Sequence, residues 1–160
     1  MTTPAAARTL TTLDGLLALG EQRQGALWRL AEPGRGLDAN VVRLGPGAVV
    51  GEHSDDVLDV LLVVLDGEGQ LVTPEGRQEL VRHTVVWLPR TSRRSLEAGA
   101  QGLVYLTAHR RRPGMAIAGA VTDTGGEAAC LLDRVCPECG RLAPERDARF
   151  CGNCGQALSR

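Results

Sequence analysis

Four cysteines near the C-terminus offer the clearest chemistry in this sequence. They form two Cys-x-x-Cys pairs, Cys136 with Cys139 and Cys151 with Cys154, and eleven residues separate the pairs. A glycine follows each pair, which is typical of a tight turn whose backbone amides face two thiolates. Two such turns supply the four sulfurs of a tetrahedral zinc site. Because four thiolates leave no coordination position for a substrate water, we expect structural rather than catalytic zinc.

A redox dithiol is the weaker interpretation of these cysteines, because thioredoxin-like chemistry places a single Cys-x-x-Cys motif on a βαβ unit. The segments CPECG and FCGNCGQAL resemble the zinc-ribbon family over essentially the whole tail. That resemblance implies a module that contacts protein or nucleic acid, or one that only staples the chain. Arginines in the tail are offset by acidic residues, so we expect protein contact or stapling. The fifth cysteine, Cys130, is expected to be an incidental thiol.

A second polar cluster opens the segment EHSDDVLDVLLVVLDGEG, residues 52–69, which then becomes an apolar run. With its preceding residues this segment resembles the first motif of the cupin family, and Gly47, His53 and Gly67 fall on the pattern. HTVVWLPRTSRRSLEA resembles the second motif, in which Pro89 keeps its place. The resemblance spans about residues 25 to 115. It implies a small β-barrel whose mouth carries the functional site.

Metal-binding cupins hold one divalent ion with three histidines and a glutamate, and the resemblance places His53, Asp55, Val60 and Arg94 at those four positions. A guanidinium stays protonated and only donates hydrogen bonds, so Arg94 cannot ligate a metal and would repel one. We therefore expect no barrel metal and predict an Asp55–Arg94 ion pair in its place. Removing one partner of a buried pair costs about 3 to 5 kcal/mol.

Three interpretations of the mouth remain open. Arg94, helped by Arg90 or Arg93, could capture a carboxylate or phosphate through its forked donors, or these arginines could be solvated rim residues. Alternatively the barrel is a metalloenzyme of oxygenase or isomerase type, in which iron, manganese or zinc is held by a non-standard set. The members of that set would be His53, Asp55, Asp59 and His109. Asp59 precedes the glutamate position by one residue, so only a β-bulge would turn it inward.

Short apolar segments broken by turn residues must position these groups. From Gln24 onward they read ALWRLA, ANVVRL, VLLVVL, GQLVT, VVWLP and GLVYLTA, with VTPEGRQ as a hairpin turn. This spacing predicts a mainly β chain, and with the resemblance a cupin-like double-stranded β-helix, or jelly-roll barrel. Val60, Leu62 and Val64 share one strand face and should form an apolar wall below His53.

Composition shifts divide the chain into four parts. We expect an N-terminal segment with a short helix over residues 1–23, the barrel over 24–118, a linker over 119–134 and the zinc ribbon over 135–160. The helix would begin near Thr11 and end at Gly20. His83 takes the place of a turn glycine and should lie on the surface.

The composition also narrows the function classes. The net charge is −1 and only four aromatic side chains occur, which argues against nucleic-acid binding. All 18 cationic side chains are arginines, which excludes every mechanism that needs a lysine amine. No apolar stretch is long enough to cross a membrane, so a cytoplasmic protein is expected. We predict a non-catalytic module that binds a small anionic or organic ligand or acts in regulation, joined to a zinc ribbon that contacts a protein partner. A nucleic-acid-binding ribbon is the weaker alternative, and the cupin resemblance implies a homodimer.

Overall fold

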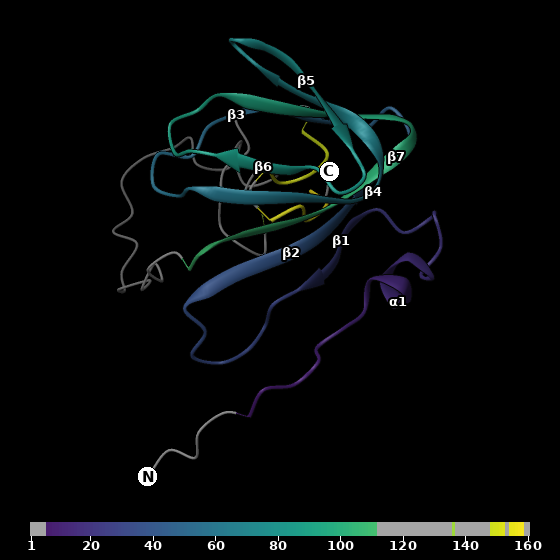
Figure 1. Cartoon of the computed structure of the whole chain (residues 1–160), viewed down its shortest axis with the longest axis vertical. Helices are drawn as coiled ribbons and strands as arrows, with labels where there is room; N and C mark the ends of the chain where they lie inside the picture. The colour runs from purple at the N-terminus through teal and green to yellow at the C-terminus, as the bar shows by residue number, and fades with distance from the viewer. Residues whose placement is uncertain (1–5, 112–135, 137–147, 153, 159–160) are drawn as a thin grey trace, which may run out of the picture.

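The computed structural model describes residues 6–111, 136, 148–152 and 154–158. Within them lie one short helix and seven strands, and every strand pairing is antiparallel (Figure 1). The elements are α1 (Leu13–Leu17), β1 (Gly25–Arg29), β2 (Leu37–Leu44), β3 (Val49–His53), β4 (Val60–Thr73), β5 (Gly76–Val81), β6 (Val85–Leu88) and β7 (Arg94–Arg110). Among these residues no helix has the length and apolar character that a membrane crossing requires.

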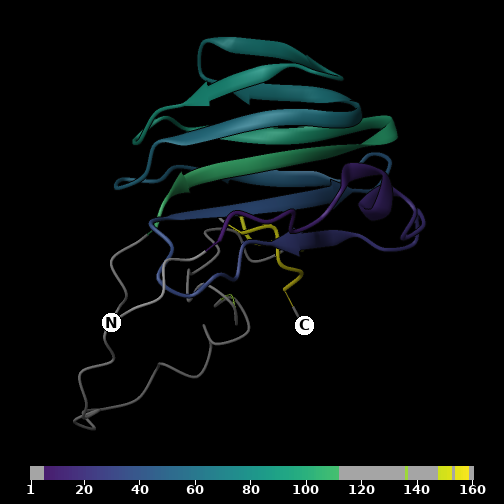
Figure 2. The same cartoon turned by 60° about the horizontal axis from the view of Figure 1, so that its bottom comes forward.

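Two long strands, β4 and β7, each belong to both layers of the β-structure. The first half of β4 and the second half of β7 pair in a layer with the order β1-β2-β7-β4-β6. Their other halves pair in a second layer with the order β3-β7-β4-β5. Figures 1 and 2 show the sheet curling from one layer into the other. The predicted jelly-roll architecture is confirmed.

Glycines make the corner where both long strands change layer. Gly67 in β4 has φ 73° and Gly102 in β7 has φ 76°, and the β4–β7 register shifts beside Gly67. A Cβ on Gly67 would overlap the carbonyl oxygen of Gly102, and a Cβ on Gly102 would lie 2.7 Å from the oxygen of Leu44. Only glycine fits such a left-handed, closely approached position. The segments VLLVVL and GQLVT, expected as separate strands, are consequently one bent strand.

The core lies between the layers and is formed by side chains of alternating strand positions. Val60, Leu62 and Val64 all face inward, as the sequence predicts, and at most 8% of each is exposed. The turn between β4 and β5 lies in the predicted VTPEGRQ segment. Alternation thus gives each strand one face for the core and one for the outside.

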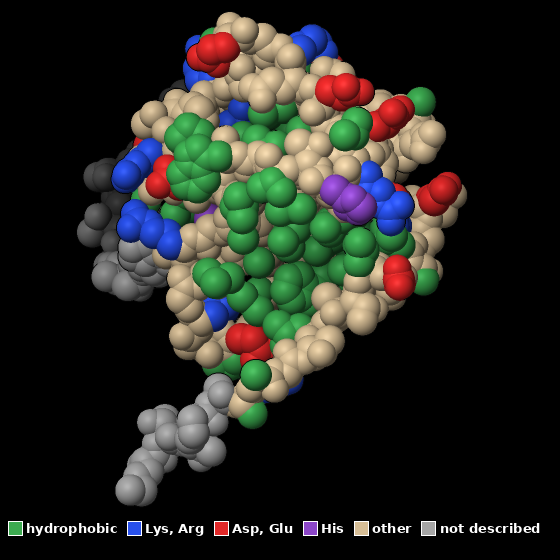
Figure 3. Space-filling model, in the orientation of Figure 1, with side chains coloured by type: hydrophobic (Ala, Val, Ile, Leu, Met, Phe, Trp, Pro, Cys, Tyr) green, Lys and Arg blue, Asp and Glu red, His purple; other side chains and the backbone are tan. Residues whose placement is uncertain are grey.

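The outer face of the first layer is also apolar, and α1 covers part of it. Leu16 packs there against Leu27 and Val104, and the Nη2 atom of buried Arg43 donates to the carbonyl of Leu17 at 3.2 Å. Farther along the face Trp87 is 60% exposed, and Figure 3 shows apolar side chains gathered over this side of the molecule. The helix begins one residue later than the predicted capping motif, since its N-cap is Thr12.

Candidate ligand and metal sites at the barrel mouth

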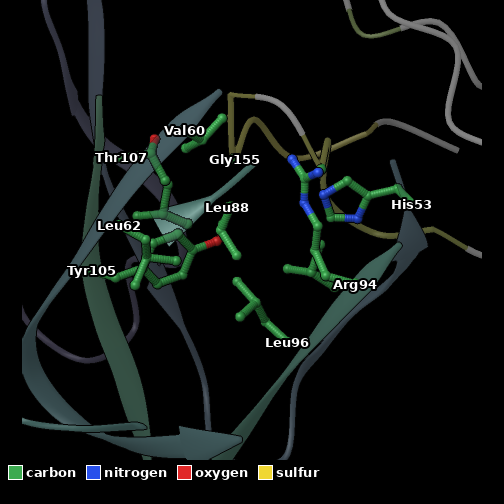
Figure 4. A pocket seen from close by; sticks show the side chains of 12 residues that line it. His53, Val60, Leu62, Leu88, Arg94, Leu96, Tyr105, Thr107 and Gly155 are labelled. Atoms are coloured by element: carbon green, nitrogen blue, oxygen red, sulfur yellow. The ribbon is translucent and has the colours of Figure 1, made fainter. Parts of the chain in front are cut away.

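His53, the last residue of β3, and Arg94, the first residue of β7, face each other across the β3–β7 pairing. Both side chains line a cavity inside the barrel mouth (Figure 4). Arg94 is only 4% exposed, and its Nη1 donates to the carbonyl of Ser92 at 2.9 Å. The Nδ1 of His53 lies 2.8 Å from the carbonyl oxygen of Gly51. The structure therefore brings His53 and Arg94 together at the mouth, and their role in ligand binding stays a prediction.

The cavity below these two side chains has apolar walls. They come from β2, β3, β4, β6 and β7, namely Val42, Val50, Val60, Leu62, Leu88, Leu96 and Tyr105. Thr107 also lines the cavity, and among the described residues its buried Oγ1 has no hydrogen-bond partner. An apolar chamber with a few polar groups at one end is the usual form of a small-molecule site.

Asp55 is buried as predicted, with 2% exposure, but its carboxylate has a local role that the motif comparison missed. Its Oδ1 accepts hydrogen bonds from the amides of Val57 and Leu58, each at 2.9 Å. The carbonyl oxygen of Asp55 accepts a further bond from the amide of Thr91. The signal for this Asx-type turn was present, because aspartate favours bonds to amides two and three residues ahead. The Asp55–Arg94 ion pair stays a prediction.

Replacing Asp55 by alanine should lower the free energy of unfolding by about 1 to 3 kcal/mol, because the buried Leu58 amide loses its acceptor. Asp55→Asn is the matched control, since it keeps an acceptor oxygen and removes only the charge. Urea unfolding of both variants measures the difference. If asparagine proves as harmful as alanine, the negative charge matters more than the turn, and the ion pair with Arg94 gains support.

The other candidate polar residues do not join His53 in one cluster. Asp59 lies on the rim, where its Oδ1 accepts from the amide of Arg90 at 2.9 Å, so no bulge turns it inward. His109 is buried at the far end of β7 and its Nδ1 lies 2.8 Å from the oxygen of Arg110. His83 is exposed with φ 73°, a conformation suited to the glycine whose place it takes.

The neighbouring arginines differ from Arg94 in exposure. Arg93 forms an ion pair with Glu52, and Arg90 lies 3.9 Å from Asp59, with side chains 67% and 59% exposed respectively. Both belong to the solvated rim, where ion pairs contribute little to stability. Of the three arginines considered from the sequence, Arg94 is the one that lines the cavity.

Three cysteines converge beside the mouth. Cys136, Cys151 and Cys154 are buried, and their sulfur atoms all lie within 4.8 Å of one another, with 3.4 Å between those of Cys136 and Cys154. Sulfurs around a tetrahedral zinc ion stand about 3.8 Å apart, because each Zn–S bond is about 2.3 Å. The cluster therefore fits a metal ion. Cys139, the fourth predicted ligand, lies outside the described residues.

Residues 148–152 and 154–158, here called the C-terminal hairpin, carry two of these cysteines. Phe150 bridges Ala157, and the amide of Gly155 donates to the oxygen of Cys151 at 2.9 Å. The hairpin lies against the barrel mouth, where Gly152 and Gly155 line the same cavity as Arg94. Both figures of the whole chain show it beside the strands of the first layer (Figures 1 and 2). Sequence reasoning did not find this docking.

The hairpin also affects the pKa of Tyr105, a residue that lines the cavity. Burial raises the pKa of the Tyr105 hydroxyl above its ordinary value, and the negative charges of Cys151 and Cys154 raise that pKa further. Tyr105 lines the same cavity as Gly152 and Gly155, so the cysteine-bearing hairpin and the barrel cavity adjoin each other.

Several solved structures are similar to this β-structure. No protein-family model matches the sequence, and no curated protein matches it. A cupin-2 domain containing protein from Shewanella frigidimarina matches with a TM-score of 0.54 and 15% identity, over 64% of this chain and 95% of the other. A conserved protein of unknown function from Streptococcus pyogenes matches with a TM-score of 0.53 and 16% identity, over 71% and 98%.

A sugar phosphate isomerase of the cupin superfamily from Silicibacter pomeroyi is also similar, with a TM-score of 0.46 and 22% identity. The match covers 49% of this chain and 53% of that protein, so this chain spans about half of its length. At these identities a likeness shows the fold alone. The matches above a TM-score of 0.5, together with the two bent strands and the enclosed core, show that the described β-structure has the cupin fold.

Proposed function

We infer that this protein is a non-catalytic cupin-like module whose C-terminal cysteines hold one structural zinc ion. The observation that carries the inference is the convergence of three buried sulfurs within 4.8 Å of one another. Thiolate-only sets select zinc and leave it no open position for chemistry. Cys139 is proposed as the fourth ligand on the spacing of the two pairs. Such a site supplies folding energy to a segment that is too short to bury a core of its own.

The barrel is proposed to bind a small anionic molecule rather than to catalyse a reaction. Arg94 supports this assignment, since it lines the cavity and brings a permanent positive charge to one of the four positions whose side chains bind metal in the resembled family. A guanidinium binds carboxylate or phosphate through paired hydrogen bonds. The apolar walls would then contact the remainder of that molecule. The expected homodimer and a protein partner for the cysteine segment stay predictions.

Metal analysis of the purified full chain tests the zinc assignment. We expect one zinc per chain in the wild type and in His53→Ala, and none after Cys136→Ser is combined with Cys151→Ser. His53→Ala is the informative control, because it removes the histidine of the barrel and leaves the thiols in place. Iron or manganese that survives the cysteine changes and disappears in His53→Ala would support the metalloenzyme instead.

A further inference from the structure

The C-terminal hairpin fits the barrel mouth closely. A Cβ added to Gly152 would lie 3.0 Å from the Cγ and Nδ1 atoms of His53, and a Cβ added to Gly155 would overlap the side chain of Val42. Phe150 packs against the barrel core, and its ring lies 3.4 Å from a Cβ built on Gly25. Both turn glycines are therefore needed for the hairpin to approach barrel side chains, which is more than a metal-binding turn alone requires.

Docking of the hairpin leaves little space in the barrel. The cavity between Gly152 and Gly155 above and the apolar walls below measures about 30 Å³. That volume accommodates about two water molecules. Pockets for small organic ligands are roughly ten times larger or more. In this arrangement the hairpin occupies the place where an anionic ligand would reach Arg94.

Charge complementarity ties the closed arrangement to the metal. Three thiolates around one Zn²⁺ ion carry a net charge of about −1. Arg94 is buried and lines the cavity together with Gly152 and Gly155 of the hairpin, and Figure 4 shows its guanidinium beside the His53 ring. A metal-loaded cluster with this net charge is a favourable neighbour for a buried cation.

We propose that the metal-loaded C-terminal hairpin is the barrel's own occupant, and that loss of the metal undocks it and opens the cavity to an anionic ligand at Arg94. The proposal rests on the metal site assigned above. Without the ion the short hairpin loses its folding energy, so its contacts with His53 and Val42 are lost as well. Because linkage is reciprocal, the docking contacts must in turn strengthen metal binding.

The modification rates of the three histidines report whether the hairpin has left the barrel mouth. Diethylpyrocarbonate modifies exposed imidazoles, and mass spectrometry reports each site separately. In the zinc-loaded full chain the hairpin packs against the half-buried His53, whereas His83 is exposed and His109 is buried elsewhere. Chelation with EDTA should raise the modification rate of His53 by about tenfold or more, with His83 and His109 unchanged. Equal rises at His53 and His109 would mean that the barrel itself unfolds, and the proposal would be wrong.

A wedge variant tests docking with the cysteines intact. Gly152→Val should displace the hairpin from His53 and make zinc transfer to a chromophoric chelator about tenfold faster. Gly36→Val is the matched control, because a Cβ at Gly36 meets no atom within 4 Å. His53→Ala introduced into Gly152→Val removes the obstructing ring and should restore slow transfer. Arg94→Met should also speed transfer, since it removes the facing cation.

The possible failures are distinguishable. A chain that binds no zinc contradicts the proposed function itself. A chain that binds zinc, but whose His53 rate is unchanged by EDTA and whose zinc transfer is unchanged by Gly152→Val, keeps the proposed function and overturns the coupling. Unchanged transfer in Arg94→Met alone, with the other results as expected, would overturn the part of the proposal that assigns the charge complementarity to Arg94.

Discussion

Replacing Cys154 by alanine should unfold the C-terminal hairpin and release the metal. Its sulfur is buried and lies 3.4 Å from that of Cys136, so the variant removes one ligand from the centre of the cluster. A structural zinc site supplies on the order of 10 kcal/mol of folding energy to a segment that cannot fold alone. We therefore expect loss of zinc and of hairpin structure, with the barrel still folded by its own core.

Trypsin cleavage after Arg149 measures this loss. Arg149 is exposed, but its carbonyl is paired with the amide of Leu158 in the hairpin, which keeps the adjacent bond out of an extended, cleavable form. Cleavage should be at least about tenfold faster in Cys154→Ala than in the wild type. Cys130→Ala is the matched control and should behave as the wild type, because no metal role is assigned to Cys130. A Cys154→Ala chain that keeps one zinc and resists cleavage would contradict the site.

Gly67→Ala should be the most damaging single change in the barrel. The new Cβ would overlap the oxygen of Gly102 at the corner where β4 and β7 pass between layers. The backbone at Gly67 also has φ 73°, which costs an alanine about 1 to 2 kcal/mol by itself. Clash and strain together predict a loss of more than about 4 kcal/mol in unfolding free energy, or failure to fold.

Gly47→Ala separates the clash from the strain. Gly47 has nearly the same φ, 69°, but a Cβ there meets no atom within 4 Å. The loss in unfolding free energy should stay at roughly 1 to 2 kcal/mol, which is the cost of the left-handed backbone conformation alone. Urea unfolding at equilibrium compares the two variants. Equal losses would show that the close approach of β4 and β7 at this corner is not what requires glycine.

Period-two patterns in the sequence identified the inward positions of the barrel well. Val60, Leu62 and Val64 face the core because alternation is a local property of a strand. The placement of His53 and Arg94 at the mouth followed from the cupin resemblance instead. The bend of β4 was missed, since a glycine in a strand pattern indicates either an end or a corner. Gly67 lies at a corner because β4 passes close to Gly102 of β7 at that point, and Gly102 is 35 residues away along the chain.

The closed mouth could not be derived from sequence spacing. The Cys-x-x-Cys-Gly pattern predicts metal turns wherever it occurs, and the same glycines fit a turn that touches nothing. Contact between Gly152 and His53 joins segments about one hundred residues apart, and it depends on the three-dimensional match of hairpin and barrel. Asp55 is the converse case, because its bonds to Val57 and Leu58 are local and its sequence context indicates such a turn.

Diffraction from crystals of the zinc-loaded full chain, measured on both sides of the zinc absorption edge, locates the metal directly. The account predicts one anomalous peak per chain, about 2.3 Å from the sulfur atoms of Cys136, Cys151 and Cys154, above the cavity that Arg94 lines. A peak inside the barrel, bound to the His53 ring and away from the cysteines, would contradict it.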